Sequence, residues 1–478
     1  MTPELDPFQR ETLDFLDAAG GRAIVADPMG ARKTATTLTW LERFAPRWEV
    51  PPLRVLVVAP SAVHGHWFRE ASRFAPSLVH LNGRGTKKQR IAALNHNDTD
   101  PFIYVTTYES MKQDEAEIRG AGFGAVVFDE GHKLKGRRTQ VALCANAVCK
   151  GVPYVIVVTG TPVLNHAYEL WQYLHMLEPR KYPAFWTWAD HNFRIEIVMF
   201  KGNRFPTRII HGFRPGRETI VRQQLSKLMI QRPIEELFAD AAWTVPTEDV
   251  VIPVTLTPKE RKAYDRLVEH GWAQLDLEKV ITDNALALTT RLLQMSSEWG
   301  TLDAQMPDGA KVVAGAELIA NLVERDEQVV VFVNYQITAN RLVDRLRVAG
   351  VSAQPFHGGI DLALREQQLV DFQKGDLNVI VGTIDSLGEG VDGLQYASST
   401  IVFVDRKWTH AKNDQAIGRL RRSGQGKRVA VYHIYATDTI DAGVVSACIR
   451  KANVVESLAG RPLKDVLYGK HFEIEETA

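Results

Sequence analysis

The stretch "AIVADPMGARKTATTL", which runs from Ala23 to Leu38, decides the fold class of this chain. It has the pattern of a short apolar strand, a loop containing Gly30 and Lys33, and the beginning of a helix. A loop of this kind presents backbone N–H groups and a helix N-terminus to a phosphate. The usual loop has a glycine directly before the lysine, whereas this chain has Arg32. Arg32 is acceptable if its backbone needs only a negative φ, because its side chain then points outward.

The residue types in the loop match the chemistry of a bound nucleoside triphosphate. Lys33 is expected to neutralise the β- and γ-phosphates, and the Thr34 hydroxyl to hold a magnesium ion. Gly30 and Arg32 belong to the same nucleotide-binding loop. On this stretch alone, an accidental strand–turn–helix is an equal alternative.

Continuous apolar runs predict the architecture. Runs without alternation are typical of strands that helices cover on both faces, so each series predicts a doubly wound parallel sheet in an α/β lobe. The runs form a first series at 23–26, 54–60, 102–107, 125–130 and 154–160, and a second at 328–334, 378–383, 400–405 and 429–435. We expect one lobe over 1–238 and one over 239–478, with helical insertions around 165–235 and 257–300 near the cleft between them.

A second segment, "AVVFDEGHKLKG" (125–136), places two carboxylates directly after a buried strand. Strand ends at the rim of a parallel sheet are where ligands collect. Asp129 is expected to hold Mg²⁺ through water, and Glu130 to orient or deprotonate the attacking water. A solvated acidic turn does not explain such a pair after four apolar residues. Together with Lys33, these acids predict a nucleotide site with a magnesium ion.

Composition limits the class of protein. The 478 residues suit two or three domains, and the 57 basic residues balance the 57 acidic ones, so any nucleic-acid binding needs a local basic surface. The three cysteines, Cys144, Cys149 and Cys448, lack the partners of a zinc site and are expected to be reduced thiols. With no signal peptide and no apolar membrane span, we expect a soluble protein of the bacterial or phage-infected cytoplasm, with a nuclear location left open.

Three segments in this order carry a family resemblance: "DEGHKLK" (129–135), "VVTGTPVLN" (157–165) and "DQAIGRLRRSGQ" (414–425). They resemble the Swi/Snf-like branch of helicase superfamily two, the ATP-driven DNA translocases, and the resemblance covers nearly the whole chain. It implies two tandem RecA-like lobes and ATP hydrolysis. The phosphate loop departs from the family at Pro28 and Arg32, where Glu and Gly are usual.

The resemblance also implies roles in the first lobe. Gln9, in "LDPFQRETLDFL", is expected to read the adenine edge. Thr159 and Thr161 are expected to couple hydrolysis to strand contacts, and His132 to relay between the two sites. The residues expected to touch the DNA backbone in this lobe are Ser61, Thr106, Thr107 and Tyr108.

In the second lobe, "VIVGTIDSLGEGVDG" (379–393) and the segment 414–425 resemble the fifth and sixth motifs. Thr383 is expected to contact DNA, and Asp392 to meet the sugar or a facing arginine. Gln415, Arg419 and Arg422 are expected to face the nucleotide. If the segment is helical, Arg419 and Arg422 share one face and stabilise charge on the γ-phosphate, worth about 10³ or more in rate.

Two basic or aromatic features have alternatives. The aromatic residues of "PAFWTWADHNF" (183–193) fit packing within the insertion better than base stacking. A basic series is either a DNA track or a solvated face, and it comprises Lys201, Arg204, Arg208, Arg214, Arg217 and Arg222. A solvated basic face is also an alternative for the run from Arg421 to Arg428.

The expected activity is therefore that of a DNA-dependent ATPase, a translocase or helicase that acts as a monomer on duplex or forked DNA without sequence preference. Its compact length resembles motors encoded by bacteriophages, by analogy only. The alternatives are an RNA-directed helicase and a non-hydrolysing scaffold that binds nucleotide and DNA. The sequence does not distinguish strand separation from annealing or tracking.

Overall fold

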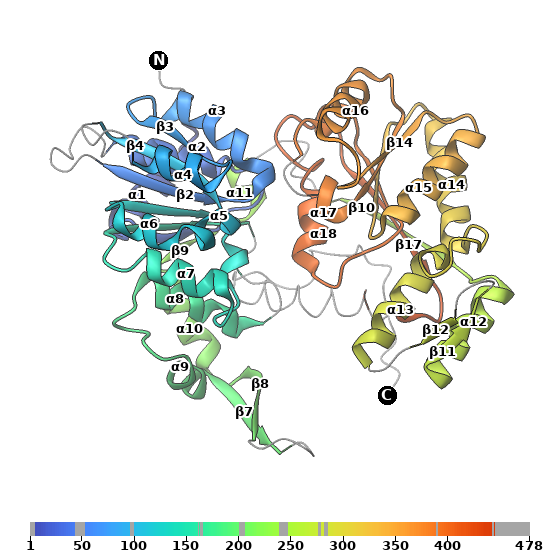
Figure 1. The fold of residues 1–478 in the computed structure, drawn as a ribbon, viewed down its shortest axis with the longest axis horizontal. Helices are drawn as coiled ribbons and strands as arrows, with labels where there is room; N and C mark the ends of the chain where they lie inside the picture. Colours follow the sequence, from blue (N-terminus) through green and yellow to red (C-terminus); the bar gives the residue numbers. More distant parts are fainter. Residues whose placement is uncertain are drawn as a thin grey trace. The chain divides into compact units, whose positions relative to one another are not determined.

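The computed structural model describes two compact units, divided between Leu237 and Phe238, which we name lobe 1 and lobe 2 (Figure 1). Lobe 1 precedes this boundary and lobe 2 follows it. The described residues are 5–43, 53–95, 100–160, 162, 166–199, 206–238, 247–275, 279–281, 285–388, 391–441 and 444.

Lobe 1 is built on a seven-stranded sheet in the order β3-β4-β2-β5-β6-β1-β9, in which every pair is parallel. The strands are β1 (Arg22–Val25), β2 (Arg54–Ala59), β3 (Val79–Gly83), β4 (Phe102–Thr107), β5 (Ala125–Asp129), β6 (Tyr154–Val158) and β9 (Met229–Ile230). The five apolar runs of the first series form β1, β2, β4, β5 and β6, as predicted. The edge strands β3 and β9 were not predicted, because β3 carries His80 and Asn82 and β9 is only two residues long.

Helices cover both faces of this sheet, so lobe 1 is doubly wound. Leu13 of α1, Leu38 of α2 and Trp67 of α3 pack in one core. Met111 of α5, Ala145 of α7 and other residues of the opposite face pack in a second core. The helices are α1 (Pro7–Ala18), α2 (Lys33–Glu42), α3 (His64–Phe74), α4 (Lys87–Leu94), α5 (Tyr108–Gln113), α6 (Glu115–Gly120), α7 (Gln140–Val148), α8 (Leu170–Leu177), α9 (Phe185–Asn192), α10 (Arg217–Leu225) and α11 (Ile234–Leu237), with short 3₁₀ turns η2 (Ser61–Val63), η3 (Gly131–Leu134) and η4 (Ala167–Glu169).

The sequence analysis expected a helical insertion around 165–235, but the described part of the region between α9 and α10 is not helical. It contains an antiparallel pair, β7 (Phe193–Val198) and β8 (Thr207–Phe213), that projects beyond α9 (Figure 1). Phe185, Trp188 and Phe193 are buried in the lobe 1 core, which confirms packing as the role of these aromatic residues.

Lobe 2 has a six-stranded parallel sheet in the order β10-β17-β16-β13-β15-β14. The strands are β10 (Glu248–Val254), β13 (Val329–Val333), β14 (Ala353–Phe356), β15 (Val379–Thr383), β16 (Thr400–Phe403) and β17 (Ala430–Ala436). The second apolar series forms the four inner strands, as predicted. Both edge strands escaped prediction because each contains a proline, Pro253 or Pro355, which an edge tolerates and an inner strand does not.

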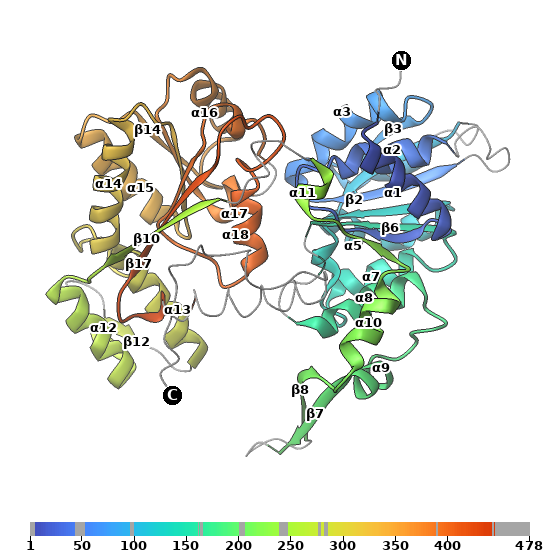
Figure 2. The ribbon, with the colours of Figure 1, turned by 180° about the vertical axis from the view of Figure 1, so that it is seen from behind.

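Helices also cover both faces of the lobe 2 sheet. Figure 2 shows α14 and α15 on one side of the strands and α16, α17 and α18 on the other. The helices are α12 (Pro258–His270), α13 (Ala285–Ser297), α14 (Ala310–Val323), α15 (Gln336–Val348), α16 (Leu362–Lys374), α17 (Ile384–Leu387) and α18 (His410–Ile417), with 3₁₀ turns η6 (Trp299–Thr301) and η7 (Leu394–Tyr396) and an antiparallel pair β11 (Trp272–Gln274) and β12 (Lys279–Ile281). Two doubly wound parallel sheets confirm the predicted fold class.

Two absences complete the description of the fold. None of the described helices is long and apolar enough to cross a membrane. Cys144 and Cys149 are free and buried, and burial raises the pKa of each thiol to about 12. Cys448 lies outside the described residues.

Candidate nucleotide-binding site

The loop between β1 and α2 turns through two residues in the left-handed region. Gly30 has a φ of 85° and Arg32 a φ of 50° with a ψ of 37°. The condition under which Arg32 was acceptable, a negative φ, is therefore not met. The conformation is the one that a glycine adopts freely, and it costs a non-glycine residue about 1–2 kcal/mol. The side chain does point outward: it is 53% exposed, and its Nη1 lies 3.4 Å from Asp6 Oδ2.

Lys33 begins α2, and its side chain folds back over the loop. Its Nζ donates hydrogen bonds to the carbonyl oxygens of Asp27 at 2.8 Å and Pro28 at 2.9 Å. Thr34 follows in the first turn of α2 and is half-buried. The partners of the ammonium thus include two neutral main-chain acceptors, which the oxygens of a phosphate can replace.

The beginning of the loop is anchored by a residue that sequence reasoning missed. This residue is Arg232, which lies just after β9. Its Nη2 atom lies 2.5 Å from Asp27 Oδ2, and its backbone N–H donates to Asp27 Oδ1 at 3.0 Å. The same guanidinium donates to α1, at Phe8 O (3.0 Å), Glu11 Oε2 (2.8 Å) and Thr12 Oγ1 (2.6 Å). Asp27 is almost fully buried. Arg232 therefore joins the loop to the first helix, and no local pattern in "MIQRPIEEL" indicates this role.

The DEGH segment (Asp129–His132) lies at the carboxyl end of β5, two strands from β1. Asp129 Oδ2 accepts a hydrogen bond from Trp67 Nε1 at 2.7 Å, and its Oδ1 accepts one from the Glu130 N–H at 2.9 Å. Burial, with a further contribution from the Glu130 charge, raises the pKa of Asp129 to about 6, and the Trp67 bond and the charge of Lys33 oppose that rise. The charge of Lys33 therefore acts on the Asp129 carboxyl group.

Glu130 and His132 form a compact pair. Glu130 has a φ of 51°, the second strained non-glycine residue of the site, and its Oε2 lies 3.1 Å from His132 Nδ1. Between them, Gly131 is required sterically, since a Cβ there would lie 2.1 Å from Val157 Cγ1 on β6. His132 is buried. A relay through His132 stays a prediction. Such a relay requires a contact between His132 and Glu130, and the two side chains are in contact.

Two further predicted residues are buried within lobe 1. Gln9 Nε2 donates to Thr36 Oγ1 at 3.0 Å, and its Oε1 accepts from the Asp6 N–H at 2.9 Å, so reading adenine requires the release of one of these bonds. The Thr159 N–H donates to Val25 O at 3.1 Å at the end of β6. Thr161 lies outside the described residues.

The residues expected to contact DNA in lobe 1 differ in exposure. Thr106 is fully buried and donates to Gly83 O, and Tyr108 is buried and donates to Asp129 O at 2.7 Å. The side chains of these two residues therefore do not reach a DNA strand in this conformation, because their hydroxyls support the fold. Ser61 is exposed, and its Oγ accepts from Arg84 Nη2 at 2.6 Å. Thr107 is half-buried and caps α5 through the Ser110 N–H.

The arginine segment of lobe 2 is not helical as expected. Helix α18 ends at Ile417, so Arg419 and Arg422 lie in the following irregular turn. Arg419 is buried, and it donates to Gly388 O at 2.8 Å and Val391 O at 3.0 Å. These bonds hold it against the fifth-motif loop, which explains why the chain leaves the helix. Both arginines still converge on that loop.

Arg422 and Asp392 form the facing pair that was one of two alternatives for Asp392. The Arg422 Nη1 lies 3.1 Å from Asp392 Oδ1, and 22% of the Arg422 side chain is exposed. Thr383 and Gln415 are both largely buried. Gly390, another glycine of this loop, lies outside the described residues.

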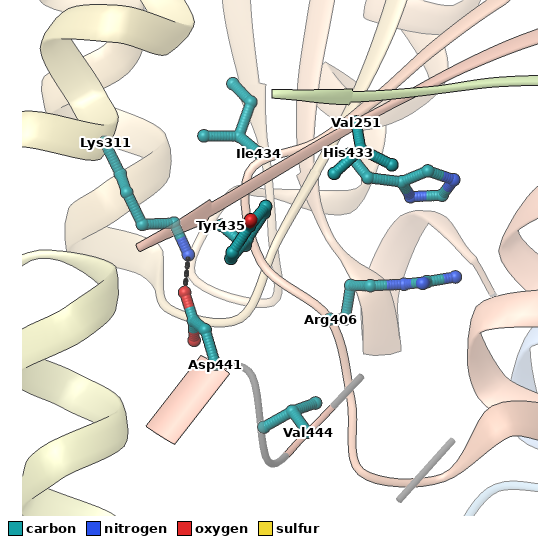
Figure 3. A pocket seen from close by; sticks show the side chains of 8 residues that line it. All are labelled: Val251, Lys311, Arg406, His433, Ile434, Tyr435, Asp441 and Val444. Atoms are coloured by element: carbon teal, nitrogen blue, oxygen red, sulfur yellow. Dashed lines mark hydrogen bonds and ion pairs between the residues drawn. The ribbon is translucent and has the colours of Figure 1, made fainter. Parts of the chain in front are cut away.

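Lobe 2 also contains a buried charge cluster that the sequence did not reveal. Lys311, near the start of α14, lies 3.1 Å from Asp405 Oδ1 and 2.8 Å from Asp441 Oδ2, and Figure 3 shows its side chain pointing toward Asp441. Asp405 also accepts from Ser297 Oγ at 2.7 Å and from the Asn334 N–H at 2.9 Å. Every member of this cluster is paired inside the lobe.

The predicted basic track is in part structural. Arg214 Nε donates to Phe193 O at 2.9 Å, and Arg217 Nε donates to His191 O at 2.8 Å. Arg208 and Arg222 form ion pairs with Asp190 at 3.5 Å and Glu218 at 3.0 Å. The remaining members, at 201 and 204, lie outside the described residues.

Comparisons with known proteins agree with this geometry. Residues 8–301 match the model of the SNF2-related domain, and residues 311–424 match the helicase conserved C-terminal domain. The ATP-dependent DNA helicase DDM1 of Arabidopsis thaliana is 24% identical over 92% of this chain and 60% of its own length. The chromodomain-helicase-DNA-binding protein 3 homolog of Caenorhabditis elegans is 21% identical over 94% of this chain and 26% of its own length. The chain thus spans less than two thirds of these relatives.

Among solved structures, the Sulfolobus solfataricus SWI2/SNF2 ATPase core in complex with dsDNA is similar at 18% identity. The match covers 95% of this chain and 94% of that chain, with a TM-score of 0.44. None of these named relatives comes from a bacteriophage, so the analogy with bacteriophage motors stays a prediction. Because the SNF2-related domain matches more than half of the chain, the protein belongs to the SWI2/SNF2 family of helicase superfamily two.

Proposed function

We propose that this protein is a DNA-dependent ATPase that uses ATP hydrolysis to move along duplex or forked DNA as a monomer. The observation that carries the proposal is that the loop of Lys33 follows β1 and the Asp129–Glu130 pair ends β5, so both lie at the carboxyl edge of one parallel sheet, where the charge of Lys33 acts on Asp129. A cation for the phosphates and a carboxylate pair for metal and water are the parts that ATP hydrolysis requires. Arg32 and Glu130 both have a left-handed backbone. Strained residues of this kind are common at ligand sites, so they support the assignment of this edge as a site.

Magnesium fits the donor set at this edge. The Thr34 hydroxyl and the Asp129 carboxylate are hard oxygen ligands, and Mg²⁺ is usually held by one or two such groups together with water and substrate phosphates. The bound ion would neutralise charge on the β- and γ-phosphates. Glu130 orients the attacking water and accepts its proton, while His132 holds the Glu130 carboxylate in place.

The arginines of lobe 2 take separate roles in this proposal. Arg422, which is partly exposed, supplies the positive charge that stabilises the γ-phosphate in the transition state, and its pairing with Asp392 holds it when no nucleotide is bound. Arg419 is a positioning residue, since its two bonds to main-chain carbonyls fix the loop that carries Asp392.

DNA binding is proposed for polar groups at the carboxyl ends of β2, β3 and β4, which are exposed at Ser61 and Arg84 and half-buried at Thr107. Ser61 and Thr107 are retained from the sequence analysis, and Arg84 joins them because it contacts Ser61. These groups suit phosphates and sugars rather than base edges, so little sequence preference is expected. Thr383 of lobe 2 is proposed as a further backbone contact.

Phosphate release with and without duplex DNA tests the proposal. We expect the parent protein to hydrolyse ATP faster with DNA, and Glu130→Gln to lose hydrolysis while it still binds ATP. Glu269→Gln, which changes an exposed glutamate of α12, is the matched control and should behave like the parent. A parent without DNA stimulation that Glu130→Gln does not alter would instead be a non-hydrolysing scaffold. Stimulation by RNA alone would favour an RNA-directed helicase.

A further inference from the structure

A pocket of about 400 Å³ lies beside the DEGH segment and has no role in the site described above. It is formed within lobe 1 by the loop that follows η3, by η4 and the start of α8, and by the first residue of α9. Its lining comprises Lys135, Gly136, Arg137, Arg138, Thr139, Tyr168, Glu169, Trp171, Gln172 and Phe185. Its volume is in the range of ligand-binding pockets.

The charge of this pocket is strongly positive. Three cations, Lys135, Arg137 and Arg138, line it against the single carboxylate of Glu169. Within the described part of the chain, neither Arg137 nor Arg138 has a carboxylate partner. Burial, and then the charge of Arg138, lower the pKa of Arg137, so the protein itself disfavours the cation at this position. An anion in the pocket would relieve that cost.

The aromatic residues fix one guanidinium in position. The Arg137 Cζ lies 3.9 Å from the centroid of the Phe185 ring and 5.3 Å from that of Trp186. A stacked guanidinium loses little further freedom when it binds an anion, and it keeps its N–H groups free for a planar or tetrahedral oxyanion. Arg137 is therefore preorganised for binding.

Two residues of the lining each have a buried polar atom without a partner among the described residues. Trp171 is 7% exposed, and its indole Nε1–H has no acceptor among the described residues. Gln172 is buried too: its Nε2 donates to Asn146 Oδ1 at 2.8 Å, while its Oε1 has no partner in the described part of the chain. Buried polar groups are rarely left without partners, so these two atoms indicate a ligand or ordered water.

The rings of the pocket do not form an open stacking platform. One face of Phe185 is covered by Arg137, and Trp171 stacks on His175 with centroids 4.7 Å apart. Tyr168 stacks on His166 at 4.8 Å. The pocket thus offers N–H donors and positive charge more than ring faces, which favours a phosphate over a nucleobase.

We propose that Arg137, Arg138 and Trp171 bind one phosphodiester of the DNA backbone. The two guanidiniums pair with the non-bridging oxygens, Trp171 donates its indole hydrogen, and Gln172 accepts from a water on the phosphate. The proposal rests on the proposed function, since it adds a DNA contact to that motor. The binding loop continues directly from Asp129–His132, so this phosphate contact lies next to the hydrolytic carboxylates in the chain.

The salt dependence of DNA affinity tests the proposal in the full-length protein. Binding of a fluorescent duplex is measured by anisotropy at several salt concentrations, without nucleotide. The double variant Arg137→Gln/Arg138→Gln is expected to bind about three- to tenfold more weakly, and its slope of log K against log salt to fall by about 1, the value of one phosphate contact. Arg119→Gln removes an exposed arginine of α6 and should keep the parent slope.

Two further variants protect the test against misfolding. Arg138 is exposed, so Arg138→Gln alone should fold and show part of the loss of slope. Trp171→Phe keeps an aromatic ring but removes the donor, and we expect about fivefold weaker binding with an unchanged salt slope, because no charge is lost. Thermal unfolding of each variant checks that the fold is retained.

The outcomes separate this proposal from the proposed function. If the parent binds duplex DNA and is stimulated by it while the arginine variants keep its affinity and slope, the pocket proposal is overturned and the motor stands. If the parent neither binds DNA nor responds to it, both fail together. A lowered slope in Arg138→Gln and the double variant, with Arg119→Gln unchanged, establishes the contact.

Discussion

The two lobes both place a lysine near the start of a helix and an aspartate at the end of a strand, yet the two pairs differ in every other respect. In lobe 1, Lys33 is held by carbonyl oxygens, and Asp129 lies beside strained residues. In lobe 2, Lys311 is 2% exposed and is paired with both Asp405 and Asp441. The residue types alone would not distinguish them.

The difference teaches how to recognise the functional edge. A charge cluster whose members neutralise one another inside the core has no capacity left for a ligand, and it serves stability or specificity of folding. The lysine of lobe 1 also donates to two loop carbonyls, which are neutral acceptors that the oxygens of a phosphate can replace. Left-handed backbone at Arg32 and Glu130 marks the same edge.

Hydrolysis should respond most strongly to the lobe 1 lysine. Lys33→Met removes the charge that faces the phosphates, and we expect phosphate release to fall by about 10²- to 10³-fold or more. The melting temperature should change far less than hydrolysis, because the hydrogen bonds lost at Asp27 O and Pro28 O are to loop carbonyls. Retained hydrolysis in this variant would mean that Lys33 is not the phosphate cation.

Stability should respond most strongly to the lobe 2 lysine. Lys311→Met leaves Asp405 and Asp441 buried without a cation, which should cost about 3–5 kcal/mol of unfolding free energy. Denaturant unfolding followed by circular dichroism measures this loss. The triple change of Lys311, Asp405 and Asp441 to apolar residues should recover much of it, and a mild effect of Lys311→Met alone would contradict the structural role.

A change at Arg232, which joins the phosphate loop to α1, should affect both hydrolysis and stability. Arg232→Lys keeps the charge but loses the fork that reaches Asp27, Glu11 and Thr12, so we expect a loss of about 2 kcal/mol and a raised KM for ATP. Arg73→Lys, at an exposed ion pair of α3, is the control and should change neither value. An unchanged KM in a destabilised Arg232→Lys would restrict Arg232 to folding.

Acid should weaken lobe 2 through His433. Burial, and then the charge of Arg406, lower the pKa of His433 to about 4, although His433 Nε2 lies 2.7 Å from Asp249 Oδ1. The unfolded chain binds a proton near pH 6.5 and the native lobe does not, so stability falls as the pH drops from about 6.5 to 4. At pH 5 the loss should be about 2 kcal/mol. His433→Gln should remove this part of the pH dependence.

Arg32→Gly should have the smallest effect. Glycine relieves the left-handed strain but adds freedom to the unfolded chain and removes an exposed ion pair, so the free energy of unfolding should change by about 1 kcal/mol or less. Hydrolysis should change by less than about tenfold, because Arg32 points away from the loop interior. Near-complete inactivation would show that Arg32 has a direct role.

Features that depend on local pattern were predictable, and pairings across long sequence distances were not. Apolar runs predicted the inner strands, and their ends located Lys33, Asp129 and Glu130. Nothing near Asp27 indicates a partner 205 residues away, and Lys311 is 94 residues from Asp405. These contacts arise only when the sheets assemble.

Three local features also differed from the sequence analysis for physical reasons. The segment of Arg419 was expected to be helical, but tertiary bonds to Gly388 and Val391 outweigh its helical spacing. The φ of Arg32 follows from loop closure against α2, which no side-chain pattern reports. The exposure of Thr106 and Tyr108 was likewise a matter of packing and could not be read from motif position.

The hydrophobic interiors of the lobes have a practical consequence for the experiments above. Among the described residues, the buried clusters of lobe 1 use residues up to Leu228, and those of lobe 2 begin at Val254. Calorimetry should therefore resolve two melting transitions, one for each lobe. The transition of the unmutated lobe then serves as an internal reference within the same sample. A shift confined to the other transition shows that the substitution destabilised only the lobe that carries it.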